Sequence, residues 1–464
     1  MRPRAAAPIA ALLVSVVGGA FASVDLAAPA PAGRNVVVTA PPSADSEGCM
    51  ACHEGIEDMH PGFPLSCVEC HGGDGQAREK VRAHVQPSAP VQTNERVLPE
   101  NHDLAYLRFV NPMDLRVAER VCGDCHGELV DHLMVSLHGT TAAHLSDGFF
   151  ENGLQDDKDS RYSVFPVSAS RGVEGNTVER LVQPPRFDPA DESSELASHF
   201  PDLIRKECMQ CHPWSQGRAV RGRVGFDGEY RGAGCAACHV PYRQDGLSES
   251  ADRTAKRVEP GHPRTHSMLA APPTETCTTC HYGDASIGLH FRGLSQLPPG
   301  APGGPEIPGT TDSLLHRAFF VNDPAVTPPD VHHASGMHCV DCHTLEGVMG
   351  DGRMVSKMEE ATEISCEACH GSLEERATMR TERGTRLKHL FERDGQVWMR
   401  SKVTGAEHRI KQVVDVVDIG HEDFNPEAQL AMTAEHGNVA CYTCHGGWNV
   451  NFLGFHFYLS LIHI

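Results

Sequence analysis

Large aromatic side chains are scarce in this chain. Phe, Trp and Tyr together make up 6% of its 464 residues. Aromatic rings supply much of the buried area of ordinary cores, and a chain of this length has room for two or three domains. We therefore expect the interior to be filled by something other than side chains.

Positive charge is also in deficit. The chain has 40 Lys and Arg residues against 61 Asp and Glu residues, which gives a formal net charge of −21. Because binding to nucleic acid depends on neutralising phosphates with Lys and Arg, we expect no nucleic-acid partner. The acidic balance is compatible with simple solubility, and a basic patch on a partner protein would complement it.

Long apolar runs are missing beyond the first residues. Residues 5–20 are apolar, Arg2 and Arg4 precede them, and Ala20-Phe21-Ala22 has the form of an A-x-A cleavage site. We predict that residues 1–22 are a signal peptide, and that the mature chain is exported to the periplasm or outer cell surface without a transmembrane span. The alternative is an N-terminal membrane anchor, although the run is shorter than the roughly 18 to 20 residues that cross a bilayer.

No cysteine stands outside one repeated motif. The 18 cysteines form nine Cys-x-x-Cys pairs, and a histidine follows the second cysteine of every pair. At this composition, random order would produce only about 0.04 such motifs in the chain. The paired cysteines are Cys49 and Cys52, Cys67 and Cys70, Cys122 and Cys125, Cys208 and Cys211, Cys235 and Cys238, Cys277 and Cys280, Cys339 and Cys342, Cys366 and Cys369, and Cys441 and Cys444. The histidines that follow them are His53, His71, His126, His212, His239, His281, His343, His370 and His445.

Cys-x-x-Cys-His is the attachment motif of haem c. Two cysteines at this spacing reach the two vinyl positions on one porphyrin edge, and the histidine is carried under the ring to bind the iron. Zinc sites and redox disulfides also use Cys-x-x-Cys, but neither needs a histidine after all nine pairs. We predict nine covalently bound haem c groups, each with one iron ligand from its own motif.

The nine motifs leave 20 of the 29 histidines for other roles, in a chain with 14 methionines. The sixth iron ligand decides whether a haem only passes electrons or also binds small molecules. We expect about half of these histidines to be distal ligands, so that most haems are bis-histidine; the alternative is that they are ordinary surface residues. The candidates, which the sequence does not assign to particular haems, are His60, His84, His138, His262, His266, His290, His332, His333, His421 and His436.

The motifs are unevenly spaced along the chain. After the signal peptide we predict a disordered leader (23–47), an N-terminal three-haem region (48–145), a haem-free insertion (146–200), a central three-haem region (201–294), a Pro/Gly-rich linker (295–330) and a C-terminal three-haem region (331–464). Helices are expected at 112–134, 195–212 and 355–380, and a β-hairpin near 395–419. The expected fold class is mainly α and irregular coil, packed around haems, with little regular secondary structure.

The chain resembles the large multihaem cytochromes c of bacterial respiratory chains. The resemblance rests on the nine motifs and on segments such as Cys67-Val68-Glu69-Cys70-His71-Gly72-Gly73, and it covers nearly the whole mature chain. Some members of that group only conduct electrons, whereas others reduce nitrite, hydroxylamine or tetrathionate, or oxidise hydroxylamine. The lysine that replaces a motif histidine in pentahaem nitrite reductases is absent here, because all nine motifs end in histidine.

We predict an electron-transfer protein whose redox partners are other cytochromes or a membrane quinol oxidase. The alternative is a multihaem oxidoreductase that converts a small nitrogen or sulfur compound at one haem with an open distal position. A structural or haem-storage role is a third reading. Residues 459–464 resemble translated sequencing-adapter read-through, so we expect a longer natural chain and nine as a minimum haem count; a genuine apolar tail is the alternative.

Overall fold

The computed structural model describes residues 44–63, 65–88, 103–169, 175–185, 190, 211–214, 220–221, 227–228, 230–243, 245–281, 287–293, 295–297, 319–321, 328–432, 436 and 439–446. The predicted signal peptide and Cys208 lie outside these residues, as does the helix predicted at 195–212 except for its last two residues. Within the described ranges, no helix is long and apolar enough to cross a membrane.

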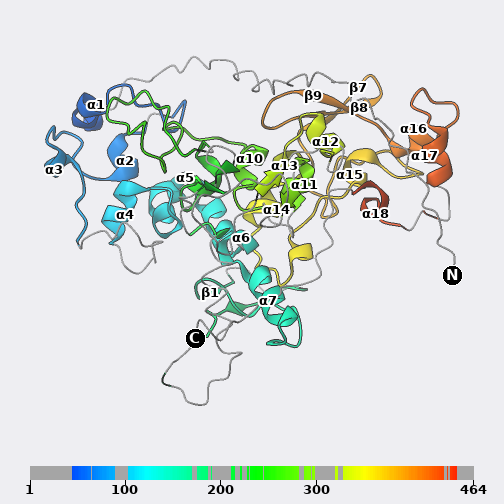
Figure 1. Ribbon diagram of the computed structural model, residues 1–464, viewed down its shortest axis with the longest axis horizontal. Helices are drawn as coiled ribbons and strands as arrows, with labels where there is room; N and C mark the ends of the chain where they lie inside the picture. Colours follow the sequence, from blue (N-terminus) through cyan, green and yellow to red (C-terminus); the bar gives the residue numbers. More distant parts are fainter. Residues whose placement is uncertain are drawn as a thin grey trace, which may run out of the picture. The chain divides into compact units, whose positions relative to one another are not determined.

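Short helices carry most of the described motifs (Figure 1). A single helical turn places residues i and i+3 on one face, which is the spacing of the two cysteines in each motif. Helices of one or two turns are unstable alone, so they depend on packing against other segments. The helices that contain motif residues are α1 (Glu47–Cys52), α2 (Cys67–His71), α5 (Leu115–Val135), α9 (Ala236–His239), α10 (Thr274–Cys277), α13 (Cys339–Cys342), α15 (Glu367–His370) and α18 (Tyr442–His445).

Helix α5 confirms the helix predicted at 112–134. The side chain of Asp114 caps its N-terminus by accepting the N–H of Arg116. The helix is kinked at His126, whose φ of −121° and ψ of 22° are not helical. The third motif therefore ends at a break in the helix, and the kink sets the direction of its histidine.

The prediction of one helix at 355–380 is wrong. This segment contains the 3₁₀ helix η5 (Met358–Glu360) and the short α15, and Gly371 ends α15 with a φ of 68°. The remaining helical elements connect the motifs: η1 (Ala44–Ser46), α3 (Lys80–Ala83), α4 (Leu104–Val110), α6 (Leu137–Thr140), α7 (Ala142–Glu151), α11 (Ile287–Phe291), α12 (Val331–Ala334), α14 (Leu345–Met349), α16 (Val413–Val417) and α17 (Pro426–Ala431).

The described strands form small antiparallel sheets. Three sheets have two strands each: β1 (Val167–Ser168) with β2 (Arg180–Leu181), β3 (Val220–Arg221) with β4 (Asp227–Gly228), and β5 (Ser295–Leu297) with β6 (Phe319–Val321). The described residues thus confirm the expected fold class of helix and irregular coil with little regular secondary structure.

The predicted hairpin near 395–419 is present with different limits. β7 (Leu390–Arg393), β8 (Gln396–Arg400) and β9 (Glu407–Ile410) form a three-stranded sheet in that order. Asp394 and Gly395 join β7 to β8 with φ of 54° and 72°, the left-handed pair that a two-residue hairpin turn requires. After Ile410 the chain forms α16 and not a continued strand, because buried polar contacts of Gln412 and Asp415 fix it there.

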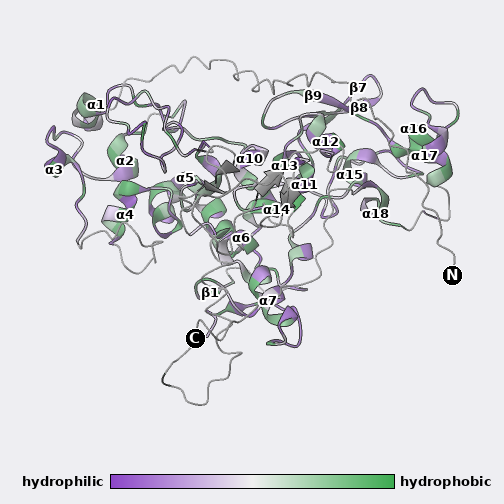
Figure 2. Ribbon diagram, viewed as in Figure 1, coloured by the Kyte–Doolittle hydropathy of each residue, from purple (hydrophilic) through white to green (hydrophobic). Residues whose placement is uncertain are grey.

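Buried apolar residues form several small clusters. Figure 2 accordingly shows hydrophobic residues spread over many separate elements. The sheet cluster, as we call the largest one, has motif cysteines Cys342 and Cys369 packed against it. Its buried members are Met337, Ala368, Leu387, Leu390, Val397, Met399 and Ile410.

Shortening Leu390 tests the sheet cluster. Leu390 is 1% exposed, so Leu390→Ala should lower the free energy of unfolding by about 2 to 5 kcal/mol. Chemical denaturation of the haem-loaded protein, followed by circular dichroism, measures this change. Leu430→Ala on α17 is the matched control, because Leu430 is 77% exposed and its truncation should cost less than about 0.5 kcal/mol. Equal effects of the two changes would contradict the assigned cluster.

Candidate haem sites

Sites 1 to 9 are the nine motifs in chain order. In at least six of them the N–H of the motif histidine donates to the carbonyl oxygen of the first motif cysteine, at 2.8 to 3.0 Å. This bond closes one helical turn, so both cysteines and the histidine have fixed relative positions. The six are His53 with Cys49, His239 with Cys235, His281 with Cys277, His343 with Cys339, His370 with Cys366, and His445 with Cys441.

Capping groups hold the turns of sites 2 and 7 in place. At site 2, Ser66 and Glu69 form a capping box around the first turn of α2. At site 7, the buried Asp341 carboxylate accepts the N–H of His338 at 2.9 Å, the hydroxyl of Ser401 at 2.9 Å and the N–H of Lys402 at 2.6 Å. Site 7 is thereby fastened to the loop between β8 and β9.

Five motif histidines each face a histidine from another segment. The ring centroids of each pair are 6.0 to 6.4 Å apart. Every partner is one of the predicted distal candidates. The pairs are His53 with His84 (site 1), His71 with His266 (site 2), His126 with His60 (site 3), His281 with His138 (site 6) and His370 with His332 (site 8).

This spacing fits two axial ligands of one iron. Two metal–nitrogen bonds of about 2 Å on opposite sides of a metal, together with the distance from each nitrogen to its ring centre, separate the two centroids by about 6 Å. The donor set of these five sites therefore fits a bis-histidine haem iron.

Hydrogen bonds orient many of these rings through Nδ1. A carbonyl or carboxylate oxygen only accepts, so Nδ1 carries the proton and Nε2 keeps its lone pair for a metal. Both rings of sites 2 and 8 are held in this way. The contacts join His53 to Asp252 (2.8 Å), His71 to the Phe109 carbonyl (2.7 Å), His239 to that of Leu269 (2.7 Å), His370 to that of Lys411 (2.8 Å), His138 to that of Val348 (2.9 Å), His266 to that of Glu57 (2.9 Å) and His332 to Asp330 (2.8 Å).

The other four motif histidines have different surroundings. Nδ1 of His212 accepts the N–H of Trp214 at 3.1 Å, in contrast to the donating Nδ1 of His239. His343 and His445 stand beside the motif histidines of sites 6 and 8, respectively. The pKa of His343 is lowered mainly by burial and next by the nearby His281.

Five predicted distal candidates lie elsewhere. His262 and His290 are half-buried and His436 is exposed. The His333 ring is 5.1 Å from that of Phe291, and its buried Nδ1 has no hydrogen-bond partner among the described residues. The fifth candidate, His421, belongs to the ion-pair network described below.

One histidine outside the predicted set has an available nitrogen. Nε2 of His408 is buried and has no hydrogen-bond partner within the described ranges. His408 lies on β9 two residues before Ile410, so it shares that residue's face, which is the face of the sheet cluster. Strand alternation is the sequence signal that points to it. His389, in contrast, uses Nε2 to donate to the carbonyl oxygen of Asp341 at 2.7 Å.

Thiols of different motifs lie beside one another. Burial raises the pKa of Cys70, that of Cys235 to about 12 and that of Cys238 to about 11. In each case the next cause is a thiol of another motif: Cys122 for Cys70 and Cys235, and Cys280 for Cys238. Buried thiols in such surroundings stay protonated at neutral pH.

The same arrangement continues along the chain. Burial raises the pKa of Cys342 to about 12, with Cys369 as the next cause. Three further pairs of thiols from different motifs perturb one another's pKa: Cys49 with Cys67, Cys277 with Cys339, and Cys366 with Cys441.

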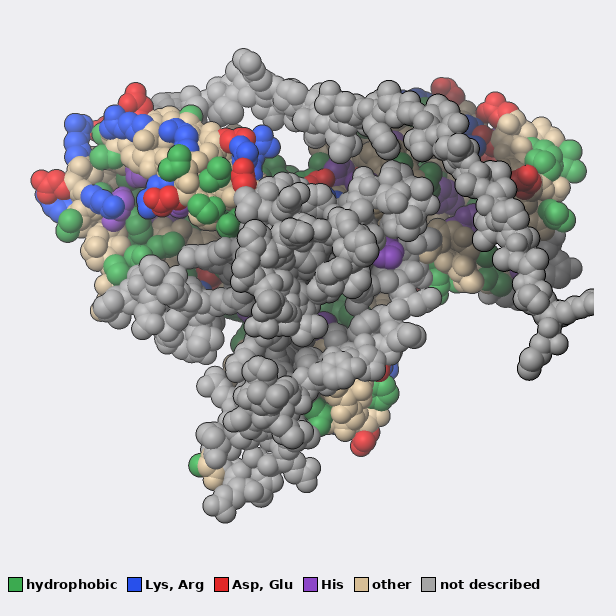
Figure 3. Space-filling model, viewed as in Figure 1, with side chains coloured by type: hydrophobic (Ala, Val, Ile, Leu, Met, Phe, Trp, Pro, Cys, Tyr) green, Lys and Arg blue, Asp and Glu red, His purple; other side chains and the backbone are tan. Residues whose placement is uncertain are grey.

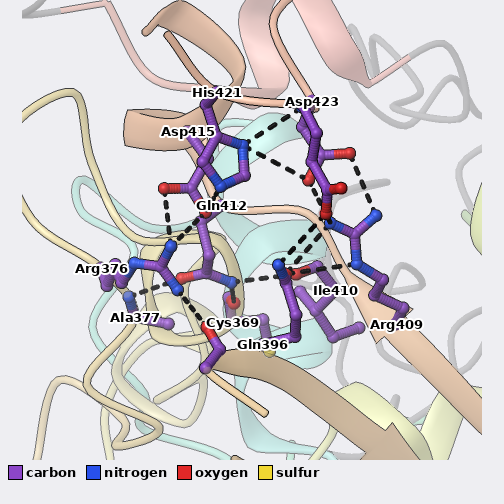
Figure 4. A network of polar contacts seen from close by, with 12 residues as sticks. Cys369, Arg376, Ala377, Gln396, Arg409, Ile410, Gln412, Asp415, His421 and Asp423 are labelled. Atoms are coloured by element: carbon purple, nitrogen blue, oxygen red, sulfur yellow. Dashed lines mark hydrogen bonds and ion pairs between the residues drawn. The ribbon is translucent and has the colours of Figure 1, made fainter. Parts of the chain in front are cut away.

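A network of polar contacts fastens site 8 to the segment after β9 (Figure 4). Gln412 is fully buried. Its Nε2 donates to the carbonyl oxygens of Cys369 at 3.0 Å and Ile410 at 3.2 Å, and its Oε1 accepts the N–H of Ala377 at 2.8 Å. The second cysteine of site 8 is thus tied to β9 through one side chain.

Ion pairs surround this buried amide. Arg376 donates to both carboxylate oxygens of Asp415, at 2.6 and 2.8 Å, and Arg409 pairs with Asp423. His421 lies between the two carboxylates: its Nδ1 accepts the N–H of Asp423 at 3.2 Å, and its Nε2 is 3.7 Å from Asp415. Both ring nitrogens of this distal candidate therefore face protein groups (Figure 4).

Histidine side chains also appear at the surface. Figure 3 shows them on the visible face in more than one part of the described chain, and it shows Lys and Arg interspersed with Asp and Glu. The ion pairs of Arg243 with Asp245, Arg253 with Glu54 and Lys256 with Glu259 illustrate this mixing. Exposed pairs of this kind contribute little to stability.

Comparison with known proteins gives one match. A family model described as cytochrome c554 and c-prime matches residues 319–371, a range that contains sites 7 and 8. Neither a curated protein nor a solved structure matches the chain significantly. The match supports covalently bound haem c with iron, and a haem-based electron-transfer role in general.

Removing the Gln412 amide tests the network at site 8. Gln412→Leu leaves buried backbone groups of Cys369 and Ala377 without partners, at about 1 to 3 kcal/mol each. We expect the free energy of unfolding of the haem-loaded protein to fall by at least about 2 kcal/mol. The control is Gln183→Leu, because Gln183 is exposed and makes one bond, to Val164. A loss no larger than that of the control would contradict the network.

Proposed function

We propose that this protein is an electron carrier that conducts electrons through nine covalently bound haem c groups, most of them bis-histidine ligated. The observation that carries the proposal is the set of five histidine pairs with centroids 6.0 to 6.4 Å apart. More than half of the nine motif histidines have such a partner, and each pair fits one iron.

Haem supplies one-electron redox chemistry, and the chain determines what else the iron meets. In each paired site, the motif cysteines would hold the haem covalently, and the motif histidine and its partner histidine would be the residues that bind the iron. A closed sixth position favours electron passage over the binding of small ligands. Nδ1 contacts such as that of His266 with the Glu57 carbonyl hold the rings in a ligating orientation.

We place the protein in the periplasm or at the outer cell surface, on the strength of the signal-like residues 1–22. The formal charge of −21 suits redox partners that present a basic patch, because opposite charges speed the encounter. Other cytochromes or a membrane quinol oxidase are the partners that fit this role.

Iron content and electron paramagnetic resonance test the proposal. The protein produced with its haem-attachment machinery should contain nine iron atoms and nine covalent haems per chain, one for each motif. The oxidised protein should show low-spin ferric signals from sites closed on both faces. Fewer than nine haems would contradict the count. A high-spin signal that changes with nitrite or hydroxylamine would support the oxidoreductase alternative instead.

Ligand exchange tests the individual pairs. His266→Met should convert one haem to histidine–methionine ligation and raise its reduction potential, because the thioether favours ferrous iron. Optical and paramagnetic resonance spectra with a potentiometric titration measure the change. His389→Met is the matched control: His389 is part-buried, but its Nε2 is engaged with Asp341, so the haem spectra should stay as they were. Unchanged spectra in both variants would mean that His266 is no ligand.

A further inference from the structure

Contacts between motif cysteines connect the sites in space. A thioether joins each cysteine to the porphyrin edge, so neighbouring cysteines from two motifs bring two porphyrin edges together. The described contacts therefore contain the spatial order of the sites, which differs from their order in the chain.

Sites 1, 2 and 3 follow one another. The thiols of Cys49 and Cys67 join sites 1 and 2, and the N–H of Gly48 donates to the carbonyl oxygen of Gly75 at 2.7 Å alongside them. Site 2 continues to site 3 through its other cysteine, Cys70, which lies beside Cys122. The pair of His60 with His126 spans the same junction, because His60 comes from the segment between motifs 1 and 2.

Site 3 is followed by site 5. Cys122 also lies beside Cys235. The backbone holds motif 5 against the segment that leads into α5, the helix of site 3: the N–H of Cys235 donates to the carbonyl oxygen of Met113 at 2.8 Å, and the Asn111 amide donates to that of Ala233 at 2.9 Å. The fourth motif is bypassed at this point.

Site 6 is a junction. Its Cys280 and Cys238 of site 5 interact electrostatically. Its helix α10 adjoins site 7, because the thiol of Cys339 donates to the Thr274 hydroxyl at 3.8 Å and interacts with Cys277. A third contact reaches site 4, because the thiol of Cys280 donates to the carbonyl oxygen of Cys211 at 3.2 Å. Site 4 also adjoins site 5, because the N–H of Gly234 donates to the carbonyl oxygen of Pro213 at 2.6 Å.

Sites 7, 8 and 9 complete the series. Cys342 and Cys369 pack on the same sheet cluster and lie beside one another. Cys366 then contacts Cys441, whose thiol also donates to Glu367 at 3.4 Å. Sites 2, 5, 6, 7 and 8 each use one cysteine toward the preceding site and the other cysteine toward the next.

We infer that the haem sites form one continuous file in the order 1, 2, 3, 5, 6, 7, 8, 9, with site 4 as a side branch beside sites 5 and 6. This inference rests on the proposed function, because it requires a haem at each motif. An electron that enters at site 1 reaches site 9 without visiting site 4. Among the nine sites, the file has two ends and the branch supplies a third terminus, so redox partners have three sites at which electrons can enter or leave.

Photoreduction from one end tests the order. A thiol-reactive ruthenium photoreductant attached at Val81→Cys on α3, 76% exposed and three residues before the site 1 partner His84, injects electrons at site 1. One variant lacks site 4 (Cys208→Ser with Cys211→Ser) and the matched variant lacks site 7 (Cys339→Ser with Cys342→Ser). The optical amplitude of the fast phase gives the fraction of haems that are reduced through the file.

The two variants have opposite expected results. Without site 4, all eight remaining haems should be reduced in the fast phase; a file in sequence order would stop after site 3 and reduce three. Without site 7, six haems should be reduced quickly, while those of sites 8 and 9 stay oxidised. Fast reduction of three haems in the first variant, or of all eight in the second, overturns the order.

Haem counts separate this inference from the proposed function. Each variant should lose one haem relative to the unmodified protein. If the unmodified protein already has fewer than nine haems, at least one motif is empty and the proposed function fails, whatever the order of the sites. If removal of site 7 costs more than one haem, the variant without site 3 (Cys122→Ser with Cys125→Ser) replaces it, and two haems should be reduced quickly. Iron positions from anomalous scattering in crystals of the haem-loaded protein give an independent readout: the site 4 iron must not lie between those of sites 3 and 5.

Discussion

The hydrogen bond from the motif histidine N–H to the carbonyl of the first motif cysteine is the constraint on which the described structure depends. It closes a single helical turn, so two thiols and one imidazole leave the backbone at fixed positions. A turn this short has little stability of its own. Caps such as Ser66 with Glu69, buried acceptors such as Asp341, and ring contacts through Nδ1 supply the support.

The apolar interior is correspondingly divided. Three of the small clusters adjoin motif cysteines. The sheet cluster shows how one of them serves two sites, because Cys342 and Cys369 both pack against it and Gln412 ties Cys369 to β9. The scarcity of aromatic residues in the sequence agrees with this arrangement. A chain that packs around flat apolar cofactors needs less side-chain volume for a single large core.

The motifs, the longest described helix and the presence of a hairpin could be predicted from the sequence, because each depends on local spacing. The pairing of distal histidines could not, since His138 and His281 lie far apart in the chain and meet only through tertiary contacts. The strand predicted after β9 is a helix. The Val-rich segment at 413–417 has the composition of a strand, but polar contacts of Arg376 and Gln412 hold it as a helix. His408 was missed because only its position on β9 shows that it points to the sheet cluster. The sequence prediction began that strand at Ile410, and β9 begins at Glu407.

The pairing of sites 1 and 2 with the centre of the chain has a consequence for biogenesis. Asp252 orients His53, and His266 faces His71, yet both come from a segment that follows five motifs. A chain that is exported N-terminus first therefore presents its second motif for haem attachment long before the residue opposite His71 has emerged. Site 3 differs, because His60 precedes its motif. Under the proposed export and haem attachment, a protein interrupted before residue 266 would therefore lack the imidazole that faces His71 at site 2.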